Sequence, residues 1–184
     1  MKHLIDAALG DLATVLHAID PSAIQSACDR IAGADKIVLF GCGREGLQLR
    51  GLAMRLHHLG LAVSMQGDMA APPVGAGDLL IASAGPGELA TVTALMRVAR
   101  DAGAEVLFLT ATPGTPAAAL ASEILTIPAQ TMATDTGMRA QSILPMGSLY
   151  EGAIFVLFEA MVLRLREQLG ISPEAMRANH TNLE

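Results

Sequence analysis

Aromatic side chains are scarce in this chain of 184 residues, which has four Phe, one Tyr and no Trp. Proteins that bind single-stranded nucleic acid commonly stack the bases on aromatic rings. The formal net charge of −6 also disfavours a partner with a phosphate backbone. We therefore expect no nucleic acid among its partners.

Cysteine is equally scarce. Cys28 and Cys42 are the two cysteines, and neither has the spacing or the companion histidines of a metal site. Such a pair is typical of reduced thiols, so we expect a cytoplasmic protein without a metal or other cofactor. Cys42 lies inside a glycine-rich turn, where it is either a small filler or a reactive thiol.

Long uninterrupted apolar runs are also missing. The longest apolar stretch, Gly152–Leu165, contains Glu159 and Arg164 and is too short to span a bilayer. Near the first residue, Asp6 and Asp11 stand where a signal peptide would be apolar. We expect no membrane among the partners.

Small and aliphatic residues dominate, and their pattern predicts the fold. Five short apolar runs alternate with segments of helical periodicity. An apolar strand that alternates with helices is typical of a parallel sheet covered on both faces, so we predict a single α/β domain over residues 1–184. It has a helical N-terminal arm at about 1–33 and a helical C-terminal tail at about 171–184. The predicted strands are 36–40, 62–66, 78–83, 105–110 and 124–127, and the predicted helices are 4–19, 22–32, 45–59, 88–102, 116–121, 149–169 and one from 172.

Two of these strands end in glycine turns that lead directly into helices. The first turn contains Gly41 and Gly43, and the second contains Gly85 and Gly87. Helix N-termini offer backbone N–H groups and a positive dipole end, and ligands in open α/β sheets bind at the carboxyl ends of strands. The two turns are therefore expected to lie side by side and to form the binding site.

Several segments resemble one known family. They are GCGREG (41–46), AMRLHHLG (53–60), GDLLIASAGPGE (77–88), ILPMGSLYE (143–151) and NHTNLE (179–184). Together they resemble the sugar isomerase (SIS) domain and, within it, the 6-phospho-3-hexuloisomerases. The resemblance implies a flavodoxin-like, three-layer α/β/α sandwich with five parallel strands. It also implies conversion of a 3-hexulose 6-phosphate to fructose 6-phosphate through an enediolate, without a metal, by a homotetramer whose sites form between subunits.

The resemblance assigns roles to individual residues. Glu151 matches the family's catalytic base, although an acidic residue in a first helical turn is also favoured by the helix dipole alone. His180 matches a proton shuttle, although a histidine near a C-terminus is commonly a solvated tail residue. The ligand-binding residues implied by the two turns are Gly41, Gly43, Arg44, Glu45, Ser83, Gly85, Gly87 and Glu88.

The phosphate anchor departs from the family pattern. Glu45 stands where the family has serine, and Ala84, Pro86 and Leu89 stand for Ser, Ser and Thr. Hydroxyl donors are lost and a carboxylate is added, which would repel a phosphate by about 4 kcal/mol at about 4 Å and an effective dielectric near 20. Leu144 and Asn179 replace a family glutamine and arginine.

Two hypotheses follow. The first is a sugar or sugar phosphate isomerase with an altered anchor, in which Glu151 is the base and His180 the proton shuttle. The second is a protein on the same frame that binds or senses a sugar derivative without phosphate, or serves only as a scaffold.

Other motifs are weaker. Gly41-x-Gly43 with Gly46 resembles a dinucleotide fingerprint, for which Asp68 is the nearest acidic residue to the second strand. His57-His58 has no carboxylate partner at ligand spacing, so a metal site there is not expected.

Overall fold

The sheet has five parallel strands. A computed structural model describes residues 1–136 and 142–183. Its strands lie in the order β2-β1-β3-β4-β5, which confirms the predicted parallel α/β architecture. The strands are β1 (Ile37–Gly41), β2 (Val63–Met65), β3 (Leu79–Ser83), β4 (Glu105–Thr110) and β5 (Glu123–Thr126).

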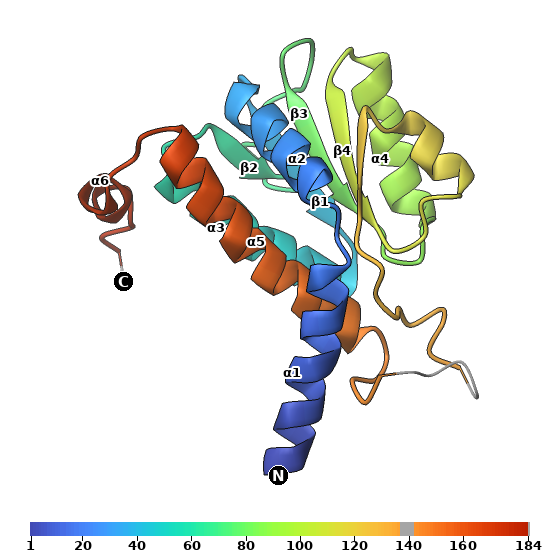
Figure 1. The fold of residues 1–184 in the computed structure, drawn as a ribbon. Coiled ribbons are helices and arrows are strands. Elements are labelled where there is room, and N and C mark those ends of the chain that lie inside the picture. The colour runs from blue at the N-terminus through green and yellow to red at the C-terminus, as the bar shows by residue number, and fades with distance from the viewer. Residues whose placement is uncertain (137–141, 184) are drawn as a thin grey trace.

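Helices cover both faces of the sheet (Figure 1). Successive strand residues point to opposite faces. In β1, Ile37 and Leu39 join the core that contains the helices α2, α3 and α5, whereas Val38 packs with α4 and η1. The helices are α1 (Lys2–His17), α2 (Pro21–Gly33), α3 (Gly43–His58), α4 (Ala90–Asp101), the 3₁₀ helix η1 (Pro116–Leu120), α5 (Ser148–Gln168) and α6 (Pro173–Ala178).

The strand order reverses between β1 and β3. The chain leaves β1 for β2 at one edge and then returns to the other side of β1 as β3. Gly41 at the end of β1 is the register partner of Ser83 at the end of β3. The two glycine turns therefore lie side by side, as expected, at the kind of switch point where open α/β sheets bind ligands.

Helix α1 extends away from the sheet (Figure 1). Its C-terminal half packs against α5, where Leu12, Val15 and Leu16 join the core. Asp11 accepts hydrogen bonds from the Ser142 hydroxyl at 2.6 Å and the Ile143 N–H at 3.2 Å, which ties the helix to the chain before α5. The N-terminal half exposes the large apolar side chains Leu4, Ile5 and Leu9.

The predicted helix boundaries differ from the observed ones at the two glycine turns. Helix α3 begins at Gly43 instead of Glu45, with φ of 57° at that first glycine. Helix α4 begins at Ala90 instead of Glu88, because Gly87, with φ of 93°, first closes a turn by donating to the Ala84 carbonyl. Over the described residues, every helix is too short or too polar to cross a membrane.

Candidate active site

The turn after β1 brings the start of α3 very close to the strand. A Cβ atom on Gly46 would lie 2.4 Å from the Gly41 carbonyl oxygen, which is a steric clash. Glycine, which has no Cβ, is therefore the residue that fits at this position. On the neighbouring strand, the turn from Ser83 to Gly87 faces this helix start. Glycine at position 46 thus allows the first turn of α3 to reach the end of β3.

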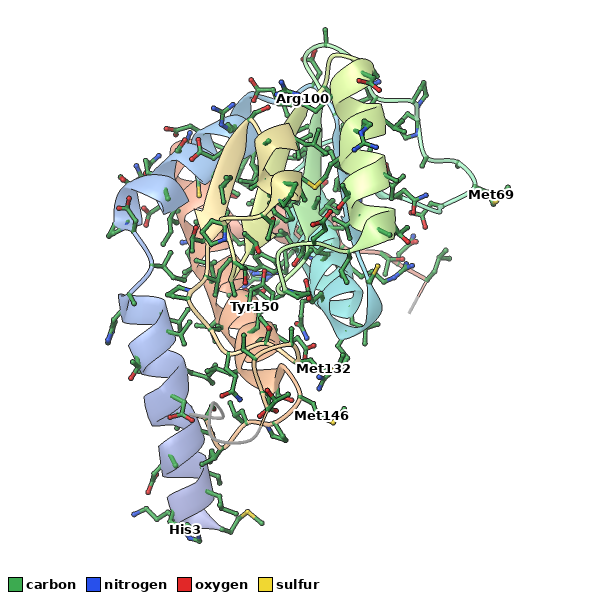
Figure 2. All side chains as sticks on the ribbon, turned by 90° about the vertical axis from the view of Figure 1, so that its right-hand side faces the viewer. His3, Met69, Arg100, Met132, Met146 and Tyr150 are labelled. Atoms are coloured by element: carbon green, nitrogen blue, oxygen red, sulfur yellow. The ribbon has the colours of Figure 1, made fainter. Side chains whose placement is uncertain are left out.

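A cavity of about 590 Å³ lies at this end of the sheet. It is lined by residues 42–45 at the start of α3, by 86, 88 and 89 after β3, by 131–133, and by 146, 147, 150 and 151 around the start of α5. In Figure 2, Tyr150 lies inside the molecule and Met132 and Met146 lie on loops at the same end. Of the eight predicted ligand-binding residues, Gly43, Arg44, Glu45 and Glu88 line this cavity, and the other four do not.

The carboxylate of Glu45 points toward the end of β3. One of its oxygens accepts a hydrogen bond from the Ser83 hydroxyl at 2.5 Å, and both oxygens lie 3.1 Å from the Gly85 N–H. Burial raises the pKa of Glu45, and the hydrogen bonds from Ser83 and Gly85 act in the opposite direction. The added carboxylate therefore lies within the predicted site and occupies the donors of the second turn.

Tyr150 completes this network from α5. Its hydroxyl lies 3.3 Å from the Ser83 oxygen, and the side chain is almost fully buried. Because the Ser83 hydroxyl donates to Glu45, the Tyr150 hydroxyl is the donor to Ser83. Burial raises the pKa of Tyr150 above its ordinary value, and the negative charge of Glu45 raises it as well. Tyr150 is not among the site residues predicted from the sequence. Its only signal was that the chain's single tyrosine directly precedes Glu151.

Arg44 joins the start of α3 to the start of α5. Its Nε lies 3.1 Å from the Glu151 carboxylate, its Nη1 donates to the Ser148 hydroxyl at 3.0 Å, and its Nη2 donates to the Met146 carbonyl. Glu151 lies in the first turn of α5, as predicted, and its carboxylate reaches the cavity. Burial raises the pKa of Glu151, the positive charge of Arg44 lowers it, and the negative charge of Glu45 raises it again.

His180 lies elsewhere in the molecule. Its ring stacks on that of His58, with centroids 5.2 Å apart, beside the C-terminal end of α3. Arg44 lies at the other end of the same helix, and the distance from Arg44 to His58 at about 1.5 Å per residue is about 21 Å. Within one chain, His180 and Glu151 therefore lie far apart. They cannot act together in a site formed by a single subunit.

The weaker motifs gain no support. Asp68 accepts a hydrogen bond from the N–H of Met65 at 3.2 Å, so its carboxylate is engaged in the turn that follows β2. Among the residues that the structure describes, histidines, cysteines and acidic residues form no group of three or more suited to a metal ion. Cys42 is partly buried at the N-cap of α3 and lines the cavity.

Comparison with known proteins places this site in a family. The SIS domain model matches residues 30–155. A Mycobacterium gastri protein named 3-hexulose-6-phosphate isomerase is 36% identical over 166 residues, covering 90% of this chain and 82% of that protein. A protein of the same name from Bacillus subtilis (strain 168) is 33% identical over 156 residues, covering 85% of this chain and 84% of its own.

The fold agrees with these sequence matches. A crystal structure from Methanococcus jannaschii, of a hypothetical protein inferred to be a 3-hexulose-6-phosphate isomerase, has a TM-score of 0.84 at 23% identity, covering 98% of both chains. At that identity the likeness shows the fold alone. The parallel sheet with a cavity at its switch point is that of an open α/β protein. The sequence matches show the family: the chain belongs to the SIS domain family.

Proposed function

We propose that this protein is an intramolecular isomerase of a sugar or sugar phosphate, related to the enzymes that interconvert a 3-hexulose 6-phosphate and fructose 6-phosphate. The relatives named 3-hexulose-6-phosphate isomerase support this, because they are 33–36% identical over more than four-fifths of their own length. The observation that carries the proposal is the Glu151 carboxylate, which reaches the cavity beside the two glycine turns.

The chemistry assigns Glu151 the role of general base. The carboxylate removes the proton from the carbon next to the carbonyl and becomes a carboxylic acid, while the sugar becomes an enediolate. Glu151 then returns a proton to the former carbonyl carbon, and the proton of the neighbouring hydroxyl moves to the former carbonyl oxygen, so that the hydroxyl and carbonyl groups exchange places. A base works best when its pKa lies near the operating pH, so the raised pKa of Glu151 suits this step. Arg44 keeps the carboxylate ionised and fixes its direction.

The enediolate oxygen needs hydrogen-bond donors. The N-cap residues of α3 and α4, Cys42 and Leu89, make no side-chain cap, and both line the cavity. Because the first N–H groups of a helix lack partners within the helix, these two N-termini are suited to stabilise the negative charge as it develops.

A second candidate function is a sugar-binding protein without catalysis. The specific observation that favours it is Glu45, whose carboxylate occupies the hydroxyl and N–H donors at the end of β3. A ligand would still fit the cavity, but the two donors at the end of β3 that could hold its phosphate are already bound to Glu45.

We further propose a cytoplasmic homotetramer with sites between subunits. Both cysteines are free thiols, which suits a reducing compartment. The exposed apolar residues of α1 and α5 (Leu4, Ile5, Leu9, Phe155, Val156 and Leu163) support an assembly that covers them. Light scattering at micromolar concentration tests this, and a monomeric mass would contradict it.

The catalytic proposal is tested with Glu151→Gln. The purified enzyme is given a 3-hexulose 6-phosphate, fructose 6-phosphate and the corresponding free ketoses in D₂O, and proton NMR follows isomerisation and deuterium uptake. We expect the variant to lose about 10²-fold or more of the turnover rate. Glu167→Gln is the matched control, because Glu167 lies on the same helix with its side chain 67% exposed and pairs only with Arg164 among the described residues. Sugar binding without turnover by the unmodified protein would favour the second candidate.

A further inference from the structure

The cavity carries more negative than positive charge. Its described lining residues include the three carboxylates of Glu45, Glu88 and Glu151 and one guanidinium, that of Arg44, which gives a formal charge of −2. Each of the three side-chain nitrogens of Arg44 already has a partner within the protein. Nε pairs with Glu151, Nη1 donates to Ser148, and Nη2 donates to the Met146 carbonyl. An incoming anion would therefore have to compete with Glu151 for the one cation that the described lining provides.

The turn after β3 has no spare donor for an anion either. From Ala84 to Gly87, the Ala84 N–H donates to the Leu109 carbonyl at 3.1 Å, and the Gly87 N–H donates to the Ala84 carbonyl at 2.9 Å. Pro86 has no N–H. The remaining N–H, that of Gly85, and the Ser83 hydroxyl both donate to Glu45. Every donor of this turn is thus used, and the last two are held by an anion that belongs to the protein.

The position of Glu45 is fixed from several sides. Ser83 and Gly85 hold its carboxylate, and Tyr150 in turn holds Ser83. Moving Glu45 aside would strand two donors, one of which, Ser83, is fully buried. A phosphate could take its place only by breaking this network and by lying beside the displaced carboxylate.

We propose that Glu45 is a specificity-determining residue whose carboxylate occupies the donors that a ligand phosphate would otherwise bind. The site then selects sugars that present hydroxyl or ammonium groups to the start of α3. The substrate class is then a free sugar or an amino sugar, and a phosphate at this position is rejected. The proposal rests on the proposed function in one respect, that the sugar binds in this cavity. A carboxylate accepts hydrogen bonds from hydroxyls and pairs with ammonium groups, which is the chemistry that would recognise such ligands.

Binding measurements test the proposal without requiring turnover. Calorimetry compares fructose, glucosamine, fructose 6-phosphate and inorganic phosphate on the unmodified protein, on Glu45→Ser and on Glu45→Gln. We expect Glu45→Ser to raise the affinity for fructose 6-phosphate at least about tenfold and to weaken the binding of glucosamine more than that of fructose. The gain for the phosphate should shrink as salt is added, because it arises from removed repulsion.

Two controls separate position from overall charge and from misfolding. Glu88→Gln removes the same single negative charge from the cavity without changing the bonds to Ser83 or Gly85, so its gain for fructose 6-phosphate should be several-fold smaller. Glu45→Gln keeps an acceptor for Ser83 and Gly85 and nearly the same shape, which preserves the comparison if Glu45→Ser does not fold. The melting temperature of each variant identifies a folding defect.

The outcomes distinguish this proposal from the isomerase proposal. If the unmodified protein binds fructose 6-phosphate as tightly as both Glu45 variants do, the specificity proposal is overturned, whether or not the protein isomerises sugars. If the affinities change as expected while no sugar is isomerised, the specificity proposal stands and the isomerase proposal fails. Equal gains in affinity for fructose 6-phosphate in Glu88→Gln and Glu45→Gln would also overturn the specificity proposal, since the overall charge of the cavity would then explain both gains.

Discussion

Arg44 and Glu151 form an ion pair across the cavity, with 3.1 Å between the guanidinium Nε and a carboxylate oxygen. The two residues lie in the first turns of α3 and α5, helices that are separated by about half of the chain. Because Arg44 also binds Ser148 and the Met146 carbonyl, it holds the chain segment that leads into α5. One side chain therefore sets both the position of the candidate base and its charge.

The first prediction concerns Arg44→Met. The positive charge of Arg44 lowers the pKa of Glu151, so its removal should raise that pKa. A general base must be deprotonated to act, hence the acidic limb of the kcat/KM profile should move to higher pH. Steady-state rates between about pH 5 and 9 provide the measurement.

Arg55→Met is the matched control for this variant. Arg55 lies on the same helix and pairs with Glu159 through two contacts of 3.1 Å, outside the cavity. We expect it to affect stability without moving the acidic limb. An equal shift in both variants would show that the limb does not report on the Arg44–Glu151 pair.

The second prediction concerns the pH dependence of stability. Burial raises the pKa of Glu45 in the folded state above its ordinary value of 4.5. The folded protein therefore binds more protons than the unfolded chain between these two pKa values, so the contribution of Glu45 to stability falls as pH rises through that window. It is fully present below about pH 4.5 and lost above the raised pKa.

Urea unfolding of the unmodified protein and Glu45→Gln over about pH 4 to 8 measures this contribution. The free energy of unfolding of the unmodified protein, relative to that of the variant, should decrease with rising pH and then level off. Glu151 has a raised pKa too, but it is present in both proteins and cancels in the difference apart from its coupling to Glu45. A relative stability that increases with pH would mean that the bonds from Ser83 and Gly85 outweigh burial.

The third prediction is a pair of glycine substitutions in α3. Gly46→Ala places a Cβ 2.4 Å from the Gly41 carbonyl oxygen, and neither atom can move without a shift of the backbone that carries it. We expect the free energy of unfolding to fall by about 1–3 kcal/mol. Gly51→Ala meets no atom within 4 Å and should instead stabilise the helix by up to about 1 kcal/mol. Equal effects in chemical denaturation would refute the close approach of α3 to β1.

Much of this frame follows from the sequence, because local signals determine it. Continuous apolar runs such as that ending at Phe40 specify buried strands, and the glycines behind them end those strands where the turns must be tight. The pairing of the two glycine turns also follows, since parallel strands align their carboxyl ends.

The inner geometry of the site depends on long-range contacts that periodicity does not encode. Glu45 binds the Gly85 N–H, 40 positions away in the sequence. Tyr150 faces Ser83, 67 positions away, because α5 packs against α2 and α3 in one particular rotation. The place of His180 depends on how α6 packs against α3, which no local pattern reveals.

The last prediction concerns His180, which the family resemblance assigns to proton transfer. In one chain it lies beside His58, about 21 Å along α3 from Arg44 and the cavity. If His180 takes part in catalysis, it must come from another copy of the chain. His180→Asn and Glu151→Gln should then each be inactive as pure assemblies. Co-expressed together in equal amounts, they should form mixed assemblies in which about a quarter of the sites contain both intact residues.

Turnover of the separately tagged, doubly purified mixed assembly is the measurement. Recovery of roughly that fraction of the unmodified activity would place His180 and Glu151 of one site on different subunits. A second mixture combines Glu151→Gln with the double variant that carries both Glu151→Gln and His180→Asn. It lacks any intact Glu151 and should remain inactive. Full activity of pure His180→Asn would instead remove His180 from the mechanism, because a proton shuttle that asparagine replaces without loss transfers no proton.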